Sequence, residues 1–167
     1  MKRYYTIIVT ALLAALFIYL FYRTEKTIIN IMFTKLFGSS ITISLRHFFK
    51  TYLPLPDLIV YSLPGALWVF SATLISRHLY VRFRKYVVPL CIFPMLYTVL
   101  LEFLQLTHFL PGTFDYIDII LAMGFGLLAR RSVKCPMPVQ HIFYQYSYRT
   151  TSLVYIYGIV FLSHVQR

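Results

Sequence analysis

The feature that most limits the fold of this chain is an uncharged apolar run over residues 5–22. A run of this length can cross the hydrocarbon core of a bilayer as a helix, which requires about 20 residues. It follows Lys2 and Arg3 and ends in Tyr-Leu-Phe-Tyr, without the small residues of a cleavage site. The pattern predicts a retained signal anchor over residues 1–22, with its N-terminus in the cytoplasm.

The composition extends this interpretation to the rest of the chain. Of its 167 residues, 59% are hydrophobic and 13% are charged, whereas about a quarter of the residues of soluble domains are charged. The length suits one membrane domain, 1–167, of about four or five spans. The formal net charge of +11 arises from cations that gather between the apolar runs. This placement favours topology signals and anionic lipid headgroups over nucleic acid as the reason for the charge.

Residues 23–57 are less apolar and are assigned to the outer side of the membrane. Apolar residues between positions 28 and 36 form a helical stripe opposite Asn30, which is typical of a helix lying in the membrane interface. Gly38 interrupts this pattern, and residues 41–46 then alternate between apolar and polar side chains. These residues are compatible with a short extended segment or with a second surface helix.

Three further apolar runs predict spans over residues 58–76, 87–106 and 115–129. The loop over residues 77–86 carries four permanent cations in ten positions and is the strongest cytoplasmic signal in the chain. The loop over residues 107–114 contains no Lys or Arg and is assigned to the outer side.

Prolines and small residues shape the second and third spans. Pro64 predicts a kink that releases the carbonyl of Val60, and Pro94 predicts a bend in the third span. Small and polar residues recur along one face of the second span and predict that this face packs on other helices. They are Ser62, Ala66, Val69, Thr73 and Ser76.

A second basic inner loop, over residues 130–149, precedes a last apolar run, 150–166. The expected fold class is therefore an all-α polytopic membrane helix bundle. It has about five transmembrane helices and an interfacial helix in the first outer loop. The cations within residues 23–57 oppose the orientation with the N-terminus inside, whereas the denser cations of the two inner loops favour it.

The polar residues most relevant to function lie between the third and fourth spans. Three of the five acidic residues, Glu102, Asp115 and Asp118, occur there. An antiparallel helix pair brings them to one depth near the outer surface. An ionised carboxylate is unfavourable at low dielectric unless it is paired, and Glu102 has no expected helix-capping role. We therefore expect Glu102 and Asp118 to form the centre of a polar pocket.

The other candidates also have structural explanations. Asp115, with Asp118 three residues later, is typical of a helix N-cap with an acidic third position. Gln105 suits a hydrogen bond between helices, His108 a solvated loop, and Trp68 core packing or an interface anchor. The candidate pocket residues are Glu102, Asp118, Gln105, Asp115, His108, Thr113 and Trp68.

Several short motifs carry a resemblance. Residues 102–105 read Glu-Phe-Leu-Gln, residues 112–118 read Gly-Thr-Phe-Asp-Tyr-Ile-Asp, and a helix with Gly124 and Gly126 follows. With the upstream segment 61–68, this pattern resembles the VanZ-like family of small bacterial integral membrane proteins over roughly residues 55–130, with a three-helix core at 58–130. Many members carry an arginine before the aspartate motif, where this chain has His108.

The resemblance implies a multi-pass protein of the bacterial cytoplasmic membrane. The founding member is associated with resistance to teicoplanin, so the resemblance makes a role in the cell envelope and in antibiotic resistance an expectation for this chain. It implies no established reaction.

Three functions are compatible with the sequence. The preferred one is a non-catalytic envelope protein whose outer pocket binds membrane lipids, lipid-linked envelope precursors or glycopeptides. The second is an enzyme acting on a lipid headgroup, with Glu102 or Asp118 as base or metal ligand and His108 as proton carrier. The third is a proton-coupled carrier that titrates at Glu102. No nucleophile motif, metal-spaced histidine pair or phosphate-binding glycine loop occurs, so we expect no metal and no cofactor.

Overall fold

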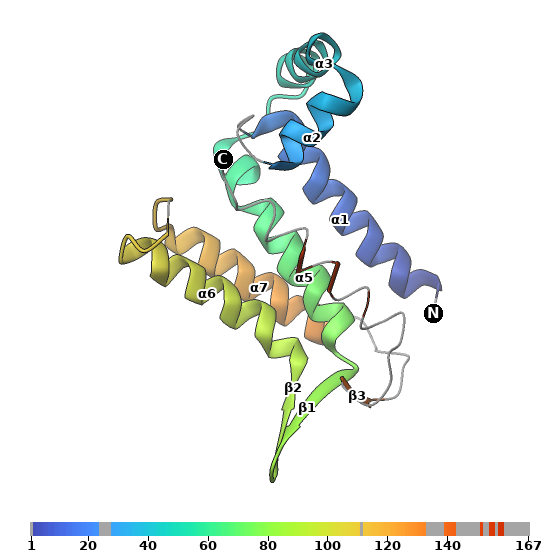
Figure 1. Cartoon of the computed structure of the whole chain (residues 1–167), viewed down its shortest axis with the longest axis vertical. Coiled ribbons are helices and arrows are strands. Elements are labelled where there is room, and N and C mark those ends of the chain that lie inside the picture. The colour runs from blue at the N-terminus through green and yellow to red at the C-terminus, as the bar shows by residue number, and fades with distance from the viewer. Residues whose placement is uncertain are drawn as a thin grey trace.

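The computed structural model describes residues 2–23, 28–110, 112–132, 139–142, 151, 154–155 and 157–158. Within these residues the chain is mostly helical, with a small sheet at one end (Figure 1). The helices are α1 (Lys2–Tyr22), α2 (Ile28–Phe37), α3 (Ser39–Tyr52), α4 (Asp57–Tyr61), α5 (Leu63–Ser76), α6 (Phe93–Leu106) and α7 (Tyr116–Ser132). The strands are β1 (Leu79–Phe83), β2 (Tyr86–Pro89) and β3 (Gln140–His141), and a 3₁₀ turn, Leu90–Ile92, precedes α6.

Helix α5 lies at the centre of the fold, with α1 on one side and the α6–α7 hairpin on the other (Figure 1). The small and polar face predicted to pack on other helices is buried throughout. Burial also extends around the rest of the helix and includes Trp68, Ser71 and Leu74. This helix therefore forms the core on which the other helices pack.

The long helices alternate in direction, as the predicted topology requires. Near one end of the fold the Tyr4 hydroxyl donates a hydrogen bond to the Leu74 carbonyl, and Arg77 Nη1 donates to the Ala129 carbonyl at 3.2 Å. Near the other end Arg23 Nη2 donates to the Tyr61 carbonyl at 2.9 Å. The basic loop after α5 thus shares one end with the start of α1, and α2, α3 and the α6–α7 connection lie toward the opposite end (Figure 1).

Residues 41–46, whose sequence is compatible with a strand or a helix, are helical. Gly38, with a φ of 86°, separates α2 from α3, and α3 continues through residues 41–46. On the inner face of α3, Phe49 stacks against Phe17 and Phe21 of α1, with ring centroids 5.0 and 4.7 Å apart. Thr42 and Arg46, four residues apart, are buried on this helix, so tertiary packing favours the helical spacing over the strand-like alternation in the sequence.

The third helix begins later than predicted. Residues 86–89 form β2, which pairs antiparallel with β1 and turns at Arg84 and Lys85. β3 pairs parallel with β1, and the sheet order is β2-β1-β3. Proline supplies no backbone N–H and suits a helix start, so Pro89 caps the 3₁₀ turn and Pro94 lies in the first turn of α6. The predicted start at residue 87 and the predicted bend at Pro94 are therefore wrong.

The kink predicted before Pro64 is confirmed, because α4 and α5 meet at Ser62. Helix α7 matches the predicted fourth span and extends three residues further, to Ser132. Most of the second basic loop and of the last apolar run lies outside the described residues.

Of the described helices, only α1, over Arg3–Tyr22, is both long and apolar enough to cross a membrane by length and composition alone. The apolar helical segments Leu63–Ser76 and Leu90–Leu106 are shorter.

Helix α7 contacts α5 and α6 through small residues. Ala122, Gly126 and Ala129 are buried. A Cβ atom added at Gly126 would lie 2.5 Å from Met95 Sδ and 3.5 Å from Val69 Cγ1. The close helix contact predicted along this face is therefore confirmed.

We predict that Gly126→Ala destabilises the fold relative to Gly124→Ala by about 1–3 kcal/mol, because the new methyl group overpacks the contact with Met95. Both substitutions improve helix propensity equally, and Gly124 has open space at its Cβ position. Thermal unfolding in detergent, followed by circular dichroism, measures the difference. Equal stability of the two variants would contradict this packing.

Candidate functional site

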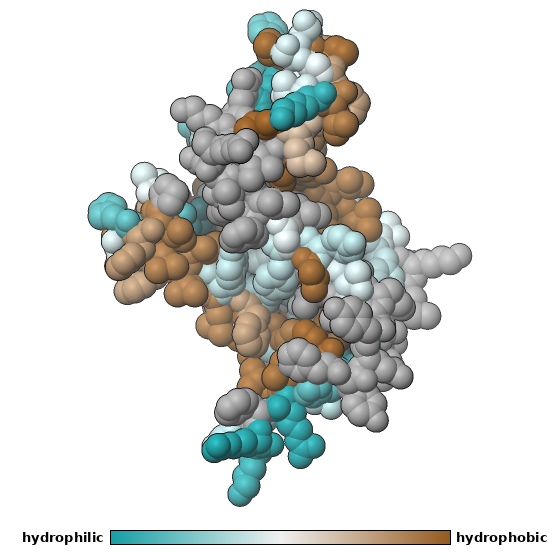
Figure 2. Space-filling model, viewed as in Figure 1, coloured by the Kyte–Doolittle hydropathy of each residue, from teal (hydrophilic) through white to brown (hydrophobic). Residues whose placement is uncertain are grey.

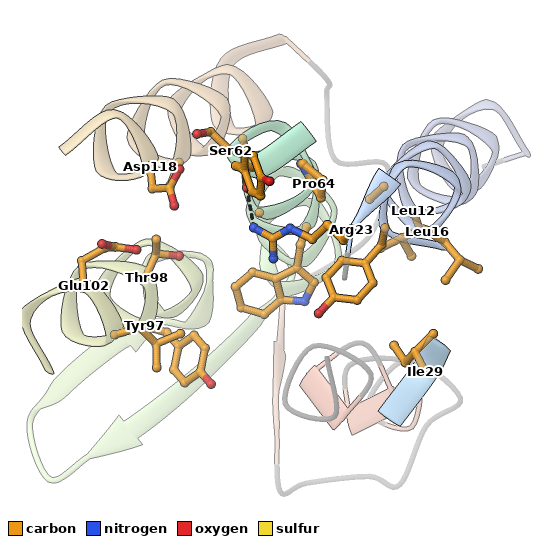
Figure 3. A pocket seen from close by; sticks show the side chains of 18 of the residues that line it. Leu12, Leu16, Arg23, Ile29, Ser62, Pro64, Tyr97, Thr98, Glu102 and Asp118 are labelled. Carbon is orange, nitrogen blue, oxygen red and sulfur yellow. Dashed lines mark hydrogen bonds between the residues drawn. The ribbon is translucent and has the colours of Figure 1, made fainter. Parts of the chain in front are cut away.

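A cavity of about 400 Å³ lies between α1, α5, α6 and the start of α7 (Figure 3). Pockets that bind small molecules have volumes of about 300–1,000 Å³. The walls are mainly apolar, and most of their polar side chains gather toward the end of the fold that carries α2. These side chains are Tyr19, Arg23, Tyr61, Ser62, Glu102, Gln105 and Asp118, whereas Tyr97 and Thr98 line the pocket from the second turn of α6.

Helix α1 explains why the pocket has a polar end and an apolar end. Leu12 and Leu16 are four residues apart and share one face of the helix, which forms an apolar wall. Tyr19 and Arg23 continue the same spacing at the C-terminal end of α1. A molecule in this pocket therefore meets apolar side chains along α1 and polar groups near its C-terminal end.

Glu102 connects the two helices of the α6–α7 hairpin. Its side chain is 6% exposed, and its Oε2 atom accepts a hydrogen bond of 3.0 Å from the backbone N–H of Asp115. The N–H groups at a helix start lack partners within the helix and favour negative charge. The expectation that Glu102 has no capping role is therefore wrong, because it caps the start of α7 from the neighbouring helix.

Asp115 acts as the N-cap of α7. Its Oδ1 atom accepts a hydrogen bond of 2.8 Å from the backbone N–H of Ile117, which is the pattern expected of a capping aspartate. Its side chain does not line the pocket. The capping interpretation of Asp115 is confirmed.

Two other candidates lie outside the pocket. His108 is exposed and has a φ of 59°, in the left-handed region at the end of α6. Its N–H donates to the Gln105 carbonyl at 3.0 Å, so its backbone belongs to the turn that ends this helix. Thr113 is also exposed and is not a lining residue.

The structure brings four of the candidates together at the pocket wall: Trp68, Glu102, Gln105 and Asp118. Trp68 is 5% exposed and stacks with Tyr97, at 5.7 Å between ring centroids. The connection between α6 and α7 closes over Gln105, since a Cβ atom at Gly112 would lie 2.9 Å from its Cδ atom. Gly112 also has a φ of 136°, which favours glycine.

Arg23 is the main site residue that sequence reasoning missed. Its guanidinium lies 5.3 Å from the ring centroid of Tyr19 and 5.6 Å from that of Tyr61, within the range of cation–π contacts. It also donates the hydrogen bond to the Tyr61 carbonyl at the break between α4 and α5. The sequence offered one signal, an arginine directly after an apolar run in the segment predicted to lie outside, where the positive-inside rule disfavours cations.

Arg23 and Glu102 both line this pocket, and no ion pair joins them in the part of the chain that the structure describes. Figure 3 shows Arg23 between the leucines of α1 and the carboxyl groups of Glu102 and Asp118. Arg23 is the one Lys or Arg among the described lining residues. The charges are thus separated across the space that a ligand would occupy.

Within the described residues, no group of three or more His, Cys, Asp and Glu side chains is arranged to hold a metal ion. Comparison of the chain with protein-family models, with curated proteins and with solved structures finds no match. The resemblance to the VanZ-like family therefore stays a prediction from the sequence motifs.

We predict that Asp115→Ala lowers the free energy of unfolding by about 1 kcal/mol, because the N–H of Ile117 loses its capping acceptor. Asp115→Asn retains a side-chain oxygen, so its free energy of unfolding should remain close to that of the parent protein. Thermal unfolding of the purified variants tests this. Equal loss in both variants would mean that the negative charge, and not the cap, stabilises α7.

Proposed function

We propose that this chain is a multi-spanning protein of a bacterial cytoplasmic membrane that binds an amphipathic or lipid-linked ligand in the pocket between α1, α5, α6 and α7. The observation that carries the proposal is the pocket itself, which is apolar along α1 and polar near the C-terminal end of that helix. An amphiphile that enters from the outer leaflet would meet groups that match its chain and its headgroup.

The surface of the α6–α7 hairpin supports a lipid environment. Leu96 and Phe103 of α6 are each 58% exposed, and Ile120 of α7 is 62% exposed, whereas Glu102 and Thr73 are buried. Figure 2 displays this hydrophobic surface over the hairpin. Apolar side chains outside and polar side chains inside are the arrangement expected of helices surrounded by lipid.

Helix lengths are compatible with several spans. With the kink at Ser62, α4 and α5 reach about 30 Å at 1.5 Å per residue, and α7 reaches about 25 Å. The hydrocarbon core is about 30 Å thick. The 3₁₀ turn and α6 together, Leu90–Leu106, also reach about 25 Å. We place α1, α4–α5, this segment, α7 and the last apolar run in the proposed bundle, and α2 and α3 in the outer interface.

The resemblance to the VanZ-like family suggests the cellular setting. A pocket at the outer leaflet faces the region where lipid-linked envelope precursors and glycopeptides meet. Sensitivity of a bacterial host to teicoplanin is therefore a suitable phenotype for the proposed function.

We predict that Glu102→Gln and Asp118→Asn each reduce lipid co-purification by about tenfold or more, since a hydrogen bond to a charged group contributes about 1.5–3 kcal/mol. Glu102→Gln keeps an acceptor for the N–H of Asp115, so the hairpin should remain folded. Asp57→Asn is the matched control, because Asp57 is an exposed carboxylate outside the pocket.

Mass spectrometry of the purified protein measures the bound lipid, and teicoplanin sensitivity of cells expressing each variant gives the phenotype. Unchanged lipid and unchanged sensitivity in both pocket variants would reject the proposal. A loss of the same size in Asp57→Asn would indicate a general effect of charge.

The proposed topology predicts different labelling of two introduced cysteines. In a background without Cys91 and Cys135, Ser39→Cys should react with an impermeant maleimide in intact cells because α3 lies outside. Lys85→Cys, in the turn between β1 and β2, should react only after lysis. The reverse pattern would invert the orientation, and labelling of both in intact cells would contradict a membrane barrier between them.

A further inference from the structure

We infer that the pocket selects a zwitterionic lipid headgroup in which a phosphate is followed by a primary ammonium group. The phosphate would lie against Arg23 and the ammonium group against Glu102 and Asp118. This inference rests on the proposed function and specifies the ligand class of the same pocket.

Arg23 provides the anion site. The guanidinium group has several N–H donors, and one of them is used by the Tyr61 carbonyl at 2.9 Å. Its Nε atom is buried and has no hydrogen-bond partner within the described residues. A forked guanidinium in a partly desolvated site is suited to a phosphate group. The rings of Tyr19 and Tyr61 hold it in place through cation–π contacts.

Glu102 and Asp118 provide the cation site. Both carboxyl groups lie on the same side of the pocket, across from α1 (Figure 3). One oxygen of Glu102 is occupied by the N–H of Asp115, so its position is fixed before a ligand binds. Two neighbouring carboxylates repel an anion and attract a cation, and this places the two charges of a zwitterion in one orientation only.

The chemistry of the carboxylates distinguishes a primary from a quaternary ammonium group. A primary ammonium group donates hydrogen bonds to carboxylate oxygens, whereas a quaternary group has no N–H and is recognised mainly by aromatic faces. Glu102 and Asp118 offer carboxylate oxygens as acceptors at this side of the pocket. The acidic side is therefore suited to a primary amine.

Helix α1 accommodates the apolar part of the same molecule. Leu12 and Leu16 continue from the polar end of the pocket along α1. A phosphate at Arg23 places the attached acyl chains beside these leucines, parallel to the proposed spans. A cavity of about 400 Å³ holds the headgroup and the beginning of the chains, while the rest extends into the surrounding lipid.

The only tryptophan of the chain, Trp68, lines the pocket and reports binding directly. Its fluorescence is measured while the detergent-solubilised full chain is titrated with short-chain phosphatidylethanolamine, phosphatidylcholine or phosphatidylglycerol. We expect a saturable change with an affinity for phosphatidylethanolamine at least about tenfold higher than for the other two, the effect of one charge-assisted hydrogen bond.

Two substitutions separate the two charge sites. Asp118→Asn should lower the affinity for phosphatidylethanolamine about tenfold and leave that for phosphatidylglycerol unchanged or higher. Arg23→Gln should lower the affinity for both lipids about tenfold. Lys50→Gln, which removes an exposed cation of α3, should change neither affinity. If Asp118→Asn does not fold, Glu102→Gln provides the same comparison.

Equal affinities for the three lipids in the parent protein, or an unchanged preference in the acidic-site variants, would overturn the headgroup assignment and leave the amphiphile pocket intact. An equal response to free phosphoethanolamine would identify a soluble ligand and also overturn it. The absence of a saturable response to any lipid, together with no co-purified lipid, would reject the proposed function itself.

Discussion

The hydrogen bond between Glu102 Oε2 and the Asp115 N–H is the interaction on which the site depends most. It places a buried carboxyl group at the positive end of α7, where the backbone N–H offsets part of the cost of burying a negative charge. It also sets the position of α7 relative to α6, and therefore that of Asp118, one turn into the helix. A carboxylate that is unfavourable in an apolar helix is thus compatible with the fold because a second helix begins beside it.

The core around α5 allows the polar groups to remain in a pocket without unfolding the bundle. Small residues such as Gly126 and Ala122 bring α7 close to α5, and α1 packs on the other side. Between these contacts, α1 and α6 leave a space in which Arg23 lies opposite two carboxyl groups. Because Arg23 and Glu102 form no direct ion pair, a zwitterionic ligand in the proposed function can contact both. We regard this separation as the main functional feature of the molecule.

Much of the helical framework could be predicted, because apolar runs and small-residue spacing act locally. The long apolar helix α1, the kink before Pro64, the capping role of Asp115 and the close packing of α7 at Gly126 all follow from such local patterns. The β1–β2 hairpin was missed because Val87 and Val88 are as apolar as the helix they precede, and strand pairing with β1 depends on residues elsewhere in the chain.

The candidate site was only partly predictable, because its residues come from segments that are distant in the sequence. The helical apolar framework and the acidic segment that contains Glu102 and Asp118 are visible in the sequence, since both are properties of neighbouring residues. The capping of α7 by Glu102, and the entry of Arg23 into the same pocket from the end of a distant helix, depend on tertiary packing. Such groups meet because helices pack side by side, and no local sequence pattern predicts which distant side chain will face a carboxylate.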